Sequence, residues 1–147
     1  MTFSVAAILA VTFTRALVAT DSLDPVKAQS TYDCHAVQLL YDTPLEIDYS
    51  ARPYKTKPGV CELVNLSSDG LTYSFKMVSS TSLTAYDVKR SIDRLRDRDN
   101  PSPGSWTMKN VDDVIVTDER SFNIRLKEKQ HVFPWMLTMA YCAIQGK

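Results

Sequence analysis

A turn, a strand and a capped helix follow one another directly within residues 67–95. Gly70 closes the turn Ser-Ser-Asp-Gly, where a glycine tolerates a positive φ. Residues 71–77 then alternate between apolar and polar, which predicts a strand with one buried face. Thr84 and Asp87 have the spacing of a capping box. The helix that they begin is expected to end near residue 99, and its predicted apolar face consists of Val88, Ile92 and Leu95.

Three further strands are predicted. Residues 61–66 precede the turn and are expected to pair with 71–77 as a hairpin. A second hairpin is expected over residues 110–126, with its turn at 118–120. In its second strand Phe122, Ile124 and Leu126 alternate with polar residues.

Two more helices are predicted. The first is expected over residues 30–45, capped by Ser30 or Thr31, with Val37, Leu40 and Tyr41 on its apolar face. The second is expected over residues 133–140, with Pro134 in its first turn, where a missing N–H group costs nothing. Its predicted core positions are Phe133, Met136, Leu137 and Ala140.

Two proline-containing segments are expected to be loops. The density of aromatic residues and prolines in 40–58 predicts a packed, rigid loop with polyproline-like stretches. The helix that begins at Thr84 is followed by Pro101 and Pro103, which indicate a second loop. Trp106 lies in that loop, and we interpret it as a core anchor rather than as a platform for a ligand.

The overall charge excludes one class of partner. Lys and Arg number 17, and so do Asp and Glu, which gives a formal net charge of zero. A general electrostatic interaction with nucleic acid or with an anionic membrane is therefore not predicted. Arginines and aspartates alternate through residues 87–99, and we interpret them as a solvated helix face with ion pairs at i,i+3 and i,i+4 rather than as an anion site.

No residue pattern predicts catalysis, a metal or a cofactor. Cys34, Cys61 and Cys142 are far apart and are expected to be buried free thiols, although one disulfide stays an open alternative. His35 and His131 have neither zinc-ligand spacing nor the pattern of a Cys–His nucleophile pair. A glycine-rich phosphate loop and a serine-centred nucleophile elbow are also missing from the sequence.

The N-terminal segment contains an apolar run of signal-peptide length. The run is too short to span a membrane, and Arg15 follows it instead of preceding it. We expect residues 1–19 to be a signal peptide and residues 20–147 to be the folded part. A buried first strand and a misassigned start of the chain are the alternatives.

Several motifs, in consistent order, resemble one family. The sequences S-S-D-G-L-T-Y-S-F at 67–75 and L-T-A-Y-D-V-K-R-S-I-D-R-L at 83–95 are similar to segments of the extracytoplasmic solute-binding proteins of peptide-type ABC importers, solute-binding protein family 5. The motif S-L-D-P at 22–25, the segment 40–58, the hairpin 114–126 and F-P-W-M-L-T-M at 133–139 add to the resemblance. Two departures are a short connection after Met77, which is expected to leave the first hairpin less covered, and a deletion between Pro103 and Val111.

The resemblance implies an α+β (mixed α/β) fold. It would be a partial first lobe of a type II periplasmic binding protein fold, with two β-hairpins packed against about three helices. The implied function is that of a periplasmic or extracytoplasmic component of an ABC import system, truncated before the second lobe. Such a component binds an oligopeptide or another small solute without catalysis and delivers it to the permease subunits. The resemblance assigns no ligand-binding residue.

Two other functions stay open, a small stand-alone protein-interaction module and a non-functional gene remnant. The strands missing from the truncated lobe are expected to leave sheet edges unpaired, which favours self-association. A ligand cleft needs two walls, so the isolated chain is expected not to bind peptide tightly.

Overall fold

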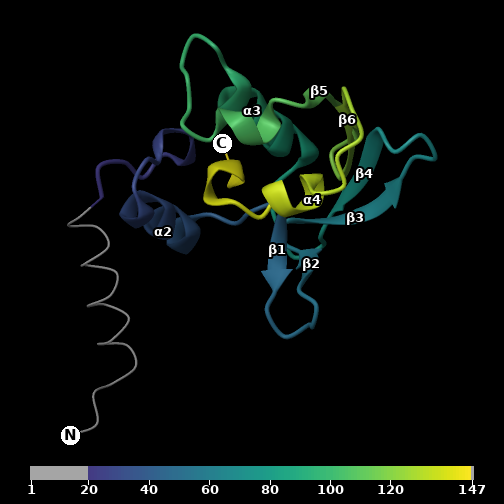
Figure 1. The fold of residues 1–147 in the computed structure, drawn as a ribbon, viewed down its shortest axis with the longest axis horizontal. Coiled ribbons are helices and arrows are strands. Elements are labelled where there is room, and N and C mark those ends of the chain that lie inside the picture. The colour runs from purple at the N-terminus through teal and green to yellow at the C-terminus, as the bar shows by residue number, and fades with distance from the viewer. Residues whose placement is uncertain (1–19, 147) are drawn as a thin grey trace, which may run out of the picture.

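The computed structural model describes residues 20–146 (Figure 1). The predicted signal peptide, residues 1–19, lies outside the described residues. The elements in chain order are η1 (Pro25–Lys27), α2 (Thr31–Leu40), β1 (Leu45–Asp48), β2 (Lys55–Pro58), β3 (Cys61–Leu66), β4 (Thr72–Met77), α3 (Ala85–Arg96), η2 (Ser105–Met108), β5 (Val111–Asp118), β6 (Ser121–Leu126), α4 (Phe133–Met136) and η3 (Ala140–Cys142). The elements named η are short 3-10 helices. No helix within residues 20–146 is long and apolar enough to cross a membrane.

The two predicted hairpins are confirmed, and they join into one antiparallel sheet of order β3-β4-β6-β5. The junction is the pairing of β4 with β6, in which Phe75 lies opposite Phe122. The rings of these two residues stack with their centroids 5.2 Å apart. β4 therefore has a hydrogen-bonded neighbour on each side.

One face of this sheet is buried against α3 (Figure 1). Alternate residues of β4 and β6 supply the apolar face: Tyr73, Phe75 and Met77, then Phe122, Ile124 and Leu126. Val88, Ile92 and Leu95 of α3 are buried in the same cluster, so its predicted apolar face is confirmed. Burial of each large side chain contributes roughly 1.5 to 3 kcal/mol. This core fixes the helix on the sheet.

The local predictions around this core are also confirmed. Gly70 has a φ of +71° in the turn between β3 and β4. Thr84 and Asp87 form the predicted capping box at the start of α3. The helix ends at Arg96 rather than near 99, because Asp97 already has an extended backbone.

The other two helices are shorter than predicted. α2 begins after the predicted cap Ser30 but ends at Leu40, because Tyr41 already has an extended backbone. Leu40 is 43% exposed and is not part of the apolar face of α2. That face is narrow, and it packs through Val37 against alanines near the C-terminus. α4 ends at Met136 because the backbone becomes extended at Met139, so that Ala140 packs beside Val37.

The predicted loop over 40–58 is wrong on both sides of its centre. Leu45–Asp48 and Lys55–Pro58 pair as an antiparallel two-stranded sheet that projects from the body of the protein (Figure 1). Leu45 is buried, whereas Tyr49 and Tyr54 at the tip are exposed and contact each other edge to face. The prolines lie at the ends of the pairing, where a missing N–H group disrupts no interior hydrogen bond.

Arg120 stabilises the short connection after β4. Its guanidinium donates hydrogen bonds to the carbonyl oxygens of Met77 and Val78, and also to those of Thr81 and Leu83. The connection therefore closes against the β5–β6 turn, and the local fold is intact despite the short segment.

The arginines of α3 are only partly a solvated face. Ion pairs within the helix are present, as in Arg90 with Asp87 at 2.7 Å and Lys89 with Asp93 at 3.3 Å. Arg94 instead pairs with Asp24 at 2.8 Å and donates to the side chain of Gln145. The interpretation as surface pairs is corrected here, because this side chain ties both ends of the described chain to α3.

Asp33 organises the segment before α2. Its carboxylate accepts hydrogen bonds from the backbone N–H groups of Asp21, Ser22, Gln29 and Ser30 at 2.9 to 3.4 Å. The N–H groups of Ser30 and Gln29 lower the pKa of this carboxyl most, burial opposes them, and those of Asp21 and Ser22 lower it further. The folded state therefore stabilises the ionised form.

We expect the variant Asp33→Asn to have a lower melting temperature than the wild type at pH 7, since an amide nitrogen would face two N–H donors. The pKa of Asp33 is lowered on folding, so its contribution is complete above the ordinary value of 3.8 and is lost as the pH falls below it. Thermal unfolding from neutral to acid pH should show a smaller acid loss in Asp33→Asn than in the wild type. Asp99→Asn, at an exposed position, is the control, and parallel acid losses in all three proteins would contradict the assignment.

We expect Arg120→Met to reduce the free energy of unfolding by about 1 to 3 kcal/mol, because four carbonyl oxygens lose a charged donor. The matched control is Arg125→Met on the same strand pair, which removes an exposed ion pair with Asp112 and should cost at most about 1 kcal/mol. Urea unfolding of both variants measures the difference. Equal effects would show that the short connection does not depend on Arg120.

Candidate functional site

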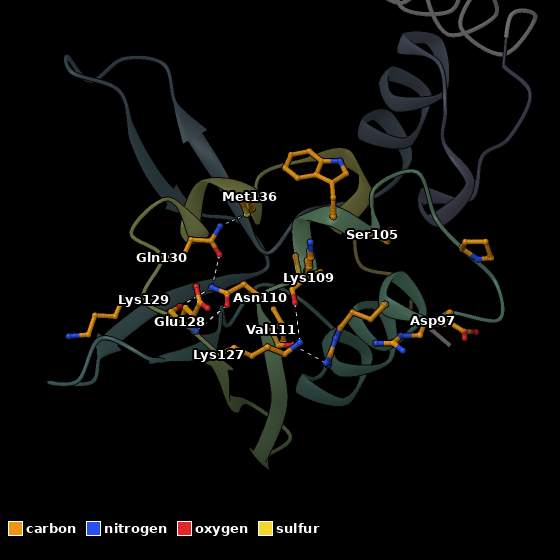
Figure 2. A pocket seen from close by; sticks show the side chains of 15 residues that line it. Asp97, Ser105, Lys109, Asn110, Val111, Lys127, Glu128, Lys129, Gln130 and Met136 are labelled. Carbon is orange, nitrogen blue, oxygen red and sulfur yellow. Dashed lines mark hydrogen bonds between the residues drawn. The ribbon is translucent and has the colours of Figure 1, made fainter.

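A groove of about 1320 Å³ lies beside the start of β5 (Figure 2). It is formed by the end of α3 and the loop after it, by η2, and by the segment that follows β6. We call it the Trp106 groove. Its lining residues are Arg96, Asp97, Arg98, Pro101, Ser105, Trp106, Met108, Lys109, Asn110, Val111, Lys127, Glu128, Lys129, Gln130 and Met136.

Asn110 fixes one wall of the groove (Figure 2). Its side-chain nitrogen donates to the carbonyl oxygen of Glu128 at 2.8 Å and to the side-chain oxygen of Gln130 at 3.0 Å. Its side-chain oxygen accepts from the backbone N–H of Glu128 at 3.1 Å. The carbonyl oxygen of Gln130 in turn accepts from the Tyr73 hydroxyl at 3.1 Å, which ties this wall to the sheet.

Two of the basic side chains in the groove are bound to the backbone. Arg96 donates to the carbonyl oxygens of Val111 and Asp112, both at 2.9 Å. Lys127 donates to the carbonyl oxygen of Lys109 at 3.2 Å. These bonds hold the end of α3 and the end of β6 against the start of β5, and so they define the floor of the groove.

Trp106 is exposed in this groove, and its prediction as a core anchor is wrong. Its side chain is 52% exposed, whereas its neighbours Thr107 and Met108 are buried. The 3-10 turn η2 directs these two residues inward, and the Thr107 hydroxyl donates to the carbonyl oxygen of Gly104 at 2.7 Å. Gly104 itself lies against Tyr141, since a Cβ there would come within 2.2 Å of the ring carbon Cγ. The packed 3-10 turn η2 therefore holds the indole of Trp106 at the surface.

No cysteine or histidine lines the groove. Cys61 and Cys142 are buried free thiols, as predicted, and Cys34 is a free thiol at intermediate depth. Burial raises the pKa of both Cys61 and Cys142 to about 12, so both stay protonated at neutral pH. His35 and His131 are exposed, and residues 20–146 contain no group of three His, Cys, Asp or Glu side chains that could hold a metal ion.

Sequence analysis did not predict the Trp106 groove as a site. Its walls come from segments that are distant along the chain, residues 96–111 and 127–136. One sequence feature could have predicted the exposure of Trp106. It follows Pro103 and Gly104 and has polar neighbours, and such a turn-forming segment is usually at the surface. Whether a side chain in such a loop is buried or exposed depends on tertiary packing.

The fold is similar to that of periplasmic binding proteins of known structure. The murein tripeptide binding protein MppA of Escherichia coli has a TM-score of 0.74 at 19% identity, covering 85% of this chain and 28% of that one. DppA from Helicobacter pylori, in complex with the peptide STSA, has a TM-score of 0.74 at 20% identity, covering 87% and 29%. AgaA from A. tumefaciens R10, in complex with agropinic acid, has a TM-score of 0.76 at 18% identity, covering 86% and 26%. The chain thus has the fold of part of one lobe of a periplasmic binding protein, and it spans less than a third of each of these proteins.

The sequence comparison narrows this class to one family. The family of bacterial extracellular solute-binding proteins, family 5 (middle), matches residues 55–146. The chain belongs to this family. A search of the curated proteins finds no match.

Proposed function

We propose that this chain contributes part of the first lobe of an extracytoplasmic binding protein that carries an oligopeptide or a similar small solute to an ABC permease. Membership in the solute-binding family supports solute binding, and the similarity to DppA and MppA supports a peptide. The proposed role involves binding and release, with no chemical step. A periplasmic location and a signal peptide over residues 1–19 are part of the same proposal.

The observation that carries the proposal is the exposed Trp106 beside a groove whose walls are held by hydrogen bonds. Solute sites combine an apolar platform with a few fixed polar groups, and Trp106 with Asn110 and Gln130 has that composition. We propose the Trp106 groove as one wall of the solute cleft. Since a single wall covers only part of a ligand, affinity of the 147-residue chain alone should be low.

We expect a pool of tri- to pentapeptides to shift the indole N–H resonance of Trp106 in an NMR titration of the 147-residue chain. The dissociation constant should exceed about 100 µM, because one wall buries only part of the ligand. Trp135, the other tryptophan, does not line the groove and serves as an internal control. An unmoved Trp106 at about 10 mM peptide, or shifts confined to Trp135, would contradict the site.

We also propose that the exposed edge of β3 allows a second copy of the chain to pair with it. Leu63, Val64 and Leu66 are exposed apolar residues on this strand, and Val64 is 61% exposed. Among the described residues, β3 pairs only with β4. A β-bulge between Leu63 and Asn65 interrupts the ladder, so the pairing should be weak.

We expect sedimentation equilibrium to give an average mass that rises with protein concentration. Val64→Lys should reduce this rise, because a charge on an edge strand opposes edge-to-edge pairing. Ile115→Lys, an equally drastic change at an exposed position of β5 on the opposite edge, is the control. A constant monomer mass would contradict the proposed pairing, and an equal effect of both variants would place the contact elsewhere.

A further inference from the structure

The end of the β1–β2 hairpin carries exposed aromatic side chains that take no part in the Trp106 groove. The hairpin projects from the body of the protein, and the residues that connect its two strands lie at its far end (Figure 1). We call residues 49–55 the tyrosine tip. Tyr49 is 68% exposed and Tyr54 is 48% exposed. Their rings contact each other edge to face with centroids 5.8 Å apart, and this aromatic pair is left in solvent.

Arg52 fixes the shape of the tyrosine tip. Its guanidinium donates to the carbonyl oxygens of Tyr49 at 2.6 Å and of Ala51 at 2.8 Å. The guanidinium carbon also lies 4.3 Å from the centroid of the Tyr54 ring, which is a cation–π contact. The two tyrosines are therefore held in place by residues of the tip itself.

The tyrosine tip has an excess of positive charge, although the whole chain has a formal net charge of zero. It contains Arg52 and Lys55 and no acidic residue. Neither cation has an ion pair within residues 20–146. The acidic residues of the hairpin precede the tip and are engaged there, since Glu46 pairs with Lys57 at 3.1 Å and Asp48 accepts two hydrogen bonds within the turn. Two exposed tyrosines and two unpaired cations thus share one projection.

The size and shape of the tyrosine tip fit a membrane surface better than a protein partner. A stable protein–protein interface involves about 20 to 30 residues on each side, whereas the tip has seven. A lipid surface requires no complementary recess. Tyrosine is enriched where the apolar part of a bilayer meets its head groups, and each lysine or arginine close to an anionic surface adds attraction. The zero net charge excludes attraction by the whole molecule, but not by a projecting part of it.

We propose that the tyrosine tip is a contact site for an anionic membrane, in which Tyr49 and Tyr54 enter the head-group region while Arg52 and Lys55 bind lipid phosphate groups. The contact goes beyond solute binding, because it involves no residue of the Trp106 groove. With only two cations and two tyrosines it is weak and reversible. Its effect is to keep the chain close to the bilayer.

The test mixes the 147-residue chain with vesicles of phosphatidylcholine, either pure or with about 30% phosphatidylglycerol, that contain a lipid with a nitroxide on its head group. Residues 1–19 have an apolar run of their own, so binding is located by NMR. Amide resonances of the tyrosine tip should broaden most, relative to vesicles without the nitroxide. The affinity should be about tenfold higher with phosphatidylglycerol, and this preference should shrink in about 0.5 M sodium chloride.

Two variants with matched controls separate the cationic from the aromatic contribution. Lys55→Gln should weaken binding to the anionic vesicles about fivefold, whereas Lys76→Gln, at an exposed position of β4, should not. Tyr49→Ser should weaken binding to both kinds of vesicle by a similar factor, whereas Tyr86→Ser, at a 56% exposed position of α3, should not. All four side chains are exposed, and the resonance dispersion of each variant checks its folding.

Each contrary result overturns a defined part of the proposal. If the tip resonances do not broaden with anionic vesicles, the membrane contact is wrong and the tip is left for a protein partner. Broadening that is strongest in α3 or in the four-stranded sheet would place the contact elsewhere. Equal affinity for both kinds of vesicle would overturn the roles of Arg52 and Lys55. None of these results bears on the Trp106 groove, whose own titration with peptides is independent.

Discussion

The pairing of β4 with β6 is the constraint on which the rest of the structure depends. Each hairpin alone would present one narrow apolar strip, and an isolated hairpin is at best marginally stable in water. The β4–β6 ladder brings the two strips together, with Phe75 stacked on Phe122 at its centre. Only the combined surface is wide enough to bury the apolar face of α3. The helix, in turn, positions every segment that contacts it.

The Trp106 groove is a consequence of that arrangement. α3 lies across the sheet, so its C-terminal end and the following loop arrive at the first residues of β5. The segment after β6 leaves from the same end of the sheet, because β5 and β6 are antiparallel. Arg96 and Asn110 then join these three parts through backbone atoms. The groove shape thus depends on main-chain geometry, which leaves the outer side chains free to differ.

How much could be predicted follows from how local each feature is. The strand 72–77 and the helix 85–96 were predicted because alternation, a turn glycine and a capping box all lie within one short stretch. The pairing of β1 with β2 was missed because each strand has four residues and the prolines between and around them resemble a loop. The exposure of Trp106 was not predicted. Thr107, Met108 and Gly104 pack inward and leave the indole outside. No sequence periodicity indicates this arrangement.

The same fold occurs in proteins that were solved with different solutes. AgaA and DppA share the fold with the present chain at similar TM-scores, although one was solved with agropinic acid and the other with a peptide. A shared backbone therefore does not determine which solute is bound. In this chain the residues that build the groove, such as Arg96 and Asn110, donate hydrogen bonds to backbone carbonyl oxygens. Those at its surface, Lys109 and Arg98, have no such commitment. Side chains of this second set can differ while the sheet and α3 stay as they are.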